Sequence, residues 1–140
     1  MLTTTAPAVR DMKQGRVRAL CAAGGALAAA LAWIVEVPLL GIHLDFRFGT
    51  GHIQTIGVGQ VIGVSLAASL IGWLLLSVLD RRTPHARAIW TTIALVALAA
   101  SLALPLAAAT TTAAAVGLIV MHLTVGAAVI PAMARSARAR

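Results

Sequence analysis

The sequence predicts an all-α membrane protein: a bundle of four transmembrane helices with both termini in the cytoplasm. Of its 140 residues, 60% are hydrophobic and only 11% are charged, and the mean hydropathy is +0.95. Soluble globular domains carry roughly 25% charged residues. Basic residues flank four apolar runs, each long enough to supply the ~20 residues that a spanning helix needs. These observations predict an integral membrane protein with little room for a separate soluble domain.

The four predicted crossings follow one another through short connections. Basic residues precede the first crossing, and we expect residues 1–17 to form a disordered cytoplasmic tail. The second crossing stops at Asp80-Arg81-Arg82, and Thr110-Thr111-Thr112 makes a tight connection to the fourth. Residues 135–140 form a basic cytoplasmic tail. The helices are expected at about 18–40, 56–79, 87–108 and 113–133, all within one transmembrane domain at 18–134.

The distribution of basic residues predicts the orientation. When successive loops are assigned to alternate sides, ten of the eleven basic residues fall on one side and only Arg47 falls on the other. The positive-inside rule then places both termini in the cytoplasm. The formal charge of +7 is explained by anchors that attract anionic lipid, so no nucleic-acid partner is expected. The single cysteine, Cys21, excludes an intrachain disulfide.

The loop between the first two crossings has the pattern of a hairpin. Residues 42–48 alternate between apolar and polar side chains, which is the period of a half-buried strand. After a turn at Gly49-Thr50-Gly51, His52-Ile53-Gln54 is expected to pair back. Ile42, Leu44, Phe46 and Phe48 would then face the bundle or lipid, and His43, Asp45 and Arg47 would lie on the other face. The sequence predicts a small outer lid.

Two helices carry stripes of small residues. The first has Ala22, Gly25 and Ala29, and the second has Gly59, Gly63 and Ala67 at four-residue spacing. Small side chains let helix backbones approach closely in lipid. Such stripes suit a compact bundle or the packing of a second copy of the chain, and both uses stay open.

Ionisable residues inside a membrane are costly, and each is a candidate functional residue. Glu36 in the first helix and His122 in the fourth are the candidate catalytic pair. The candidate ligand-binding residues are Gln60, Ser101, Trp33, His43, Asp45 and His52. Helix geometry places the intramembrane members in the outer half, as expected for a pocket open to the outside. The alternative is structural: Glu36 would reach the interface, and His122 would donate an interhelical hydrogen bond.

Three functions are compatible with this pattern. The first is binding of a small lipophilic molecule, with Glu36 as acid and His122 as base for isomerase or cyclase chemistry that needs no cofactor. The second is an accessory protein that binds a larger membrane partner. The third is a proton-coupled transporter. Whether the protein is an enzyme is left open. His43, His52 and His122 show no tight ligand spacing, so no metal site is predicted.

The chain resembles a family of small four-pass membrane proteins from high-GC bacteria, catalogued only as a domain of unknown function. The resemblance is carried by residues 36–41, 101–106 and 121–126, together with Asp80-Arg81-Arg82 and Trp90. It implies the four-helix topology and a place in the bacterial cytoplasmic (inner) membrane. It also draws attention to Glu36, Ser101 and His122, but it supplies no activity. One departure is Val37, which separates Glu36 from Pro38 where similar sequences often have the pair adjacent.

Overall fold

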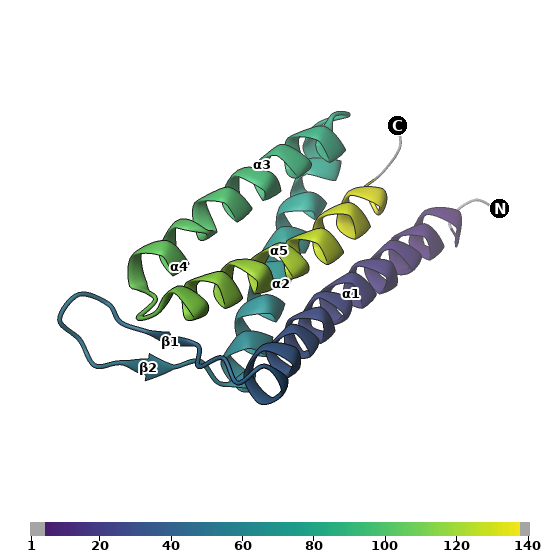
Figure 1. The fold of residues 1–140 in the computed structure, drawn as a ribbon. Coiled ribbons are helices and arrows are strands. Elements are labelled where there is room, and N and C mark those ends of the chain that lie inside the picture. The colour runs from purple at the N-terminus through teal and green to yellow at the C-terminus, as the bar shows by residue number, and fades with distance from the viewer. Residues whose placement is uncertain (1–4, 138–140) are drawn as a thin grey trace.

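Four segments of the chain form helices that are long and apolar enough to cross a bilayer (Figure 1). They are found in a computed structural model that describes residues 5–137, with side chains from residue 12 onward. The four spans are Met12–Leu39, Val58–Arg82, Ala86–Ala108 and Thr112–Arg135. Lipid offers no hydrogen-bond partners, so an apolar span must satisfy its backbone groups within its own helix. The predicted all-α class with four spanning helices is confirmed.

The elements follow the predicted order with two differences. They are α1 (Thr5–Ile34), the π-helical turn η1 (Val35–Leu39), β1 (Asp45–Phe46), β2 (Gln54–Thr55), α2 (Val58–Arg82), α3 (Ala86–Ser101), α4 (Ala103–Ala108) and α5 (Thr112–Arg135). Residues 5–17, expected to be a disordered tail, continue α1, whereas residues 1–4 lie outside the described residues. The third crossing breaks at Leu102 because Pro105 has no N–H to donate to the carbonyl four residues earlier.

The helices form a bundle in which α1 packs against α2 and α5, and α3 packs against the other sides of α2 and α5 (Figure 1). We call the end where α1 begins and α5 ends the basic end, and the opposite end the hairpin end. The buried residues of α1 and η1 gather on one face, as expected for a helix that packs on one side: Arg18, Ala22, Gly25, Ala26, Ala29 and Glu36. Small residues thus fill the middle of this face, and ionisable residues mark both of its ends.

The two small-residue stripes have different roles. A Cβ added to Gly25 would lie 2.5 Å from Val129 Cγ2 and 3.2 Å from Ser69 Oγ, so glycine lets α1 approach α2 and α5 closely. A Cβ added to Gly59 or Gly63 would meet nothing within 4 Å. The stripe of α2 therefore points out of the bundle, and only the stripe of α1 is used for packing within the chain.

The predicted hairpin is present as a short two-stranded sheet, but its returning strand is Gln54–Thr55 and does not include His52 and Ile53. Asp45 pairs with Thr55 and Phe46 with Gln54 in antiparallel register. Backbone hydrogen bonds tie it to the α4–α5 connection: Arg47 N donates to Ala108 O at 2.8 Å, and Thr110 N donates to Asp45 O at 3.1 Å. We call residues 41–57 the hairpin cap, because they cover one end of the bundle.

Of the apolar residues in the alternating segment 42–48, Leu44 most clearly faces the bundle as predicted. Leu44 is fully buried, and its side chain closes the hairpin end of the bundle core formed with Ala29, Val61, Leu118 and Met121. Ile42 and Phe46 are half-buried, but Phe48 is exposed, because the strand pairing ends at Phe46 and the chain then turns away. Leu44 is thus the apolar plug that holds the cap on the helices.

Candidate functional site

The side chain of Glu36 is the exceptional group of this bundle. It is only 5% exposed, and neither of its carboxyl oxygens has a hydrogen-bond partner among the described residues. It lies seven residues after Ala29, so it continues the face of α1 that packs against α2 and α5. A carboxyl group is therefore buried inside a candidate membrane span, and no described residue is its hydrogen-bond partner.

The backbone around Glu36 is a π-helical turn. Pro38 lacks an N–H and disrupts the α-helical pattern, and the last bonds of the turn are wide, with Leu40 N donating to Val35 O and Ile42 N to Glu36 O. Gly41, with φ of +67°, then ends the helix and starts the cap. Single π-turns within helices are frequent at functional sites. The turn places Glu36 directly below the segment that leads to Leu44.

Gly117 on α5 provides the space for the carboxyl group. A Cβ added to Gly117 would lie 3.2 Å from Glu36 Oε2 and 2.9 Å from Leu44 Cδ2. Three elements, the turn η1, the cap and α5, therefore meet at the Glu36 carboxyl. Leu44 itself belongs to the apolar core cluster with Ala29, Val61, Leu118 and Met121. An ionised carboxylate without a partner is strongly disfavoured in such a place, so the site suits a neutral acid or a guest that donates a hydrogen bond.

Replacing Gly117 by alanine is expected to lower the free energy of unfolding by about 1–3 kcal/mol, since overpacking of a filled core has this cost. The added methyl group would press on Leu44, which has no free space because it is fully buried. Equilibrium unfolding in mixed micelles with SDS measures the change. The matched control is Gly59→Ala, where a Cβ meets nothing within 4 Å. Equal losses in the two variants would contradict this packing.

The other intramembrane candidates bond to their own helices. Gln60 is exposed, and its Oε1 accepts from Gly57 N at 3.1 Å, which caps the start of α2. Ser101 Oγ donates to Leu98 O at 2.7 Å. His122 Nδ1 lies 2.6 Å from Leu118 O, one turn earlier on α5, so this nitrogen carries the proton that it donates. These hydrogen bonds give each side chain a local structural role.

His122 lies on a different face of α5 from the residue that contacts Glu36. At 3.6 residues per turn, His122 is about 140° around the helix from Gly117 but only about 40° from Gly126. Gly126 faces α3, because an added Cβ would lie 2.7 Å from Leu98 Cδ2. His122 is also not a hydrogen-bond partner of Glu36, whose carboxyl oxygens have none among the described residues. The expected acid and base therefore lie on different faces of the packing around α5.

Of the four candidates in or near the cap, two form hydrogen bonds and two are exposed on its surface. Trp33 Nε1 donates to Ile56 O at 3.0 Å and so connects α1 to the cap. Asp45 Oδ1 accepts from Thr55 Oγ1 at 2.6 Å, a hydrogen bond within the cap itself. His43 and His52 are exposed. Among the described residues, no three His, Cys, Asp or Glu side chains gather closely enough to hold a metal ion.

A second buried polar cluster lies at the basic end, and the sequence patterns did not predict it. Arg18, 4% exposed, donates four hydrogen bonds: to Asp80 Oδ2 at 2.5 Å, Ser77 Oγ at 2.8 Å, Ser136 O at 3.1 Å and Ser136 Oγ at 3.2 Å. This Arg18 cluster joins α1, α2 and the end of α5. One signal was available, because Arg18 lies on the same helix face as Ala22, Ala29 and Glu36.

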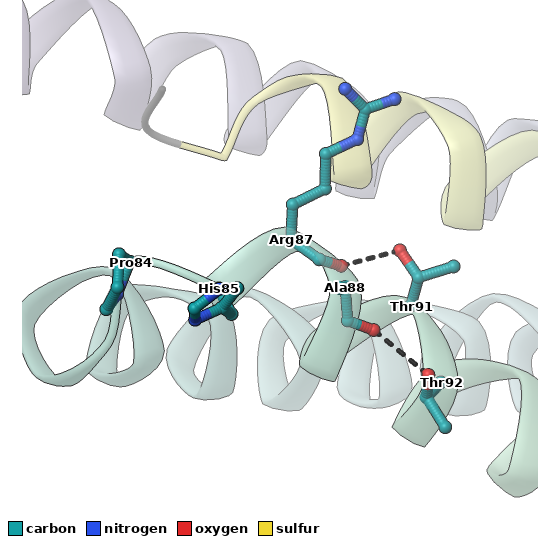
Figure 2. A pocket seen from close by; sticks show the side chains of 6 residues that line it. All are labelled: Pro84, His85, Arg87, Ala88, Thr91 and Thr92. Atoms are coloured by element: carbon teal, nitrogen blue, oxygen red, sulfur yellow. Dashed lines mark hydrogen bonds between the residues drawn. The ribbon is translucent and has the colours of Figure 1, made fainter. Parts of the chain in front are cut away.

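Two surface hollows lie away from Glu36. One, of about 540 Å³, lies along the first turns of α3 and is lined by Pro84, His85, Arg87, Ala88, Thr91 and Thr92 (Figure 2). Its two threonine hydroxyls donate to the carbonyls of Arg87 and Ala88, so they are already used. Figure 2 shows the Arg87 side chain extending away from the rest of the lining. The other hollow lies between α1 and α5.

Comparison with known proteins gives a family but no activity. Neither the curated proteins nor the solved structures contain a match to the chain. Residues 10–139 match the model of a family to which no function is assigned. With nearly the whole chain matched, the protein belongs to the family of unknown function DUF6069.

Proposed function

We propose that the protein is a membrane-embedded binding protein for a small lipophilic molecule that carries a hydrogen-bond donor or a positive charge, such as an amine. The observation that supports this is the Glu36 carboxyl group, buried at 5% exposure with both oxygens unpartnered among the described residues. Buried polar groups without partners are rare and costly, and those within membranes are commonly functional. A guest that donates to Glu36 supplies the missing partner.

The surroundings define the chemistry of the guest. A Cβ added to Gly117 would meet both the Glu36 carboxyl and Leu44, and Leu44 belongs to the apolar core cluster with Val61, Leu118 and Met121. Carboxyl oxygens accept hydrogen bonds, and an ionised carboxylate pairs with a cation. A molecule with an apolar body and one amine or hydroxyl group matches both properties. It reaches the site when the Leu44 side chain moves, because Leu44 closes the hairpin end.

The geometry favours binding over acid–base catalysis. Catalysis by Glu36 and His122 requires both groups to reach one substrate. His122 lies about 40° around α5 from Gly126, which faces α3, and its Nδ1 bonds to Leu118 O of its own helix. Glu36 is therefore proposed as the binding group, and the cap as the cover of its site. The distribution of basic residues supports a cytoplasmic basic end and an outward-facing cap.

Native mass spectrometry of gently extracted protein tests this function. Wild-type protein is expected to retain a small adduct that Glu36→Leu loses, whereas Ser101→Ala, whose hydroxyl donates to Leu98 O of its own helix, keeps it. If extraction strips the guest, a panel of lipophilic amines is titrated against thermal stability. The proposal is abandoned if the wild type and Glu36→Leu bind the same adducts, or if no amine stabilises the wild type over the variant.

Glu36→Leu is also expected to raise the free energy of unfolding of the empty protein by about 1–3 kcal/mol, the cost of a buried unsatisfied polar group. Leucine is similar in size and needs no hydrogen bond in the apolar surroundings. Unfolding in SDS mixed micelles after removal of bound molecules measures this change. Loss of stability on substitution would mean that Glu36 has a structural partner.

A further inference from the structure

We propose that the groove between α1 and α5 at the basic end binds one anionic phospholipid of the surrounding bilayer. The groove has a volume of about 340 Å³. It is lined by Val17, Leu20, Cys21 and Gly24 of α1 and by Ala128 and Ala132 of α5. This lining is apolar and lies within two membrane spans, so an acyl chain is the guest that its chemistry fits.

The groove is open because its walls are small where the helices face each other. A Cβ added to Gly24 would meet nothing within 4 Å, and Ala128 on the opposite wall is exposed. Next to Gly24, and directed toward the core, Gly25 allows tight contact with Val129. The two helices therefore touch along one line and leave a channel beside it. A lipid chain in this channel would complete the packing that small side chains leave unfilled.

Each wall of the groove ends in an exposed basic residue at the basic end. On α1, Lys13, Val17, Leu20 and Gly24 are spaced by four, three and four residues, so they lie on one helix face. On α5, Ala128, Ala132 and Arg135 are spaced by four and three residues and also share a face. Lys13 and Arg135 thus lie beyond the same end of the channel, one on each side.

Charge selects the headgroup. Lys13 and Arg135 form no hydrogen bond or ion pair with other residues in the described part of the chain, whereas the neighbouring Arg18 is fully paired. Figure 1 shows that α1 begins and α5 ends at the same end of the bundle. Basic residues beside a transmembrane groove attract phosphate headgroups. A phosphodiester between Lys13 and Arg135, with one acyl chain in the channel, satisfies both features.

The test compares lipid retention by native mass spectrometry. Wild-type protein from nanodiscs with equal phosphatidylglycerol and phosphatidylcholine is expected to keep one phosphatidylglycerol. The double variant Lys13→Gln/Arg135→Gln is expected to bind it about 30-fold more weakly, since each basic residue near the surface contributes about fivefold. The matched control Arg81→Gln/Arg82→Gln removes the same charge at the same end and is expected to retain the lipid.

A second pair of variants tests the groove itself. Gly24→Leu fills the channel and is expected to displace the lipid, whereas Gly63→Leu, which is equally open but lies on α2, leaves it bound. A photoactivatable phosphatidylglycerol is expected to cross-link to residues 17–24 and 128–132. The proposal would be overturned if the wild type retained phosphatidylcholine equally well, or if the two charge variants lost the lipid equally. It would also be overturned if Gly24→Leu retained the lipid, or if the cross-links formed elsewhere.

Discussion

Replacing Asp80 by alanine is expected to lower the free energy of unfolding of the bundle by about 3–5 kcal/mol, the largest effect expected of a single substitution in this chain. The reason is that Arg18 is only 4% exposed and donates to Asp80 at 2.5 Å. Removing the carboxylate leaves a guanidinium buried without its counterion. Equilibrium unfolding in mixed micelles with SDS, followed by far-UV circular dichroism, measures the loss.

Two further variants serve as controls. The first tests whether loss of any charge at this end lowers stability, and the second tests whether the shape of the Asp80 side chain, rather than its charge, matters. Arg81→Ala alters an exposed charge one residue away and is expected to change stability by less than about 0.5 kcal/mol. The double variant Arg18→Met/Asp80→Leu removes both charges, and apolar replacement of a buried ion pair is often neutral or stabilising. It is therefore expected to be more stable than Asp80→Ala alone. A double variant as unstable as Asp80→Ala would show that shape, and not charge pairing, matters at this position.

Replacing Leu44 by alanine is expected to cost about 2–5 kcal/mol and to open the Glu36 site, because deleting a large part of a fully buried side chain leaves a cavity. The cavity would lie beside the Glu36 carboxyl, because Gly117 brings both side chains together. Unfolding measures the stability, and the rate at which a hydrophobic carbodiimide modifies Glu36, mapped by mass spectrometry, measures access.

The control for this substitution is Phe48→Ala in the same cap. Phe48 is 56% exposed, so its loss is expected to leave both the stability of the bundle and the modification of Glu36 nearly unchanged. Unchanged modification of Glu36 in Leu44→Ala would contradict the role of Leu44 as the plug of the site.

The fold was predictable because its main signal is local. A membrane span needs only a sufficient run of apolar residues, and each of the four runs meets that requirement independently of the others. The hairpin was predictable for a similar reason, since alternation over residues 42–48 is a property of one short segment. The break at Leu102 was missed although Pro105 signals it, because hydropathy alone does not register the missing N–H.

The candidate site was predictable only in part. Glu36 stood out because an ionisable residue in an apolar run is unusual, and the structure gives it the most unusual surroundings. Its neighbours Gly117 and Leu44 come from distant segments and carry no chemical signal of their own. Gln60, Ser101 and His122 were selected by the same rule of polarity, and each forms a hydrogen bond within or at the start of its own helix.

The sequence by itself determined that this chain has four segments long and apolar enough to span a membrane, and it singled out the acidic residue in the first of them. Only the tertiary structure decided that Arg18 pairs with Asp80, 62 positions away, and that Glu36 lies sealed beneath Leu44 with no partner in the described part of the chain. Hydropathy adds up residue by residue along one segment, so a sequence displays it directly. The rotation of each helix about its axis depends on packing against all the others, and that rotation selects which side chains meet.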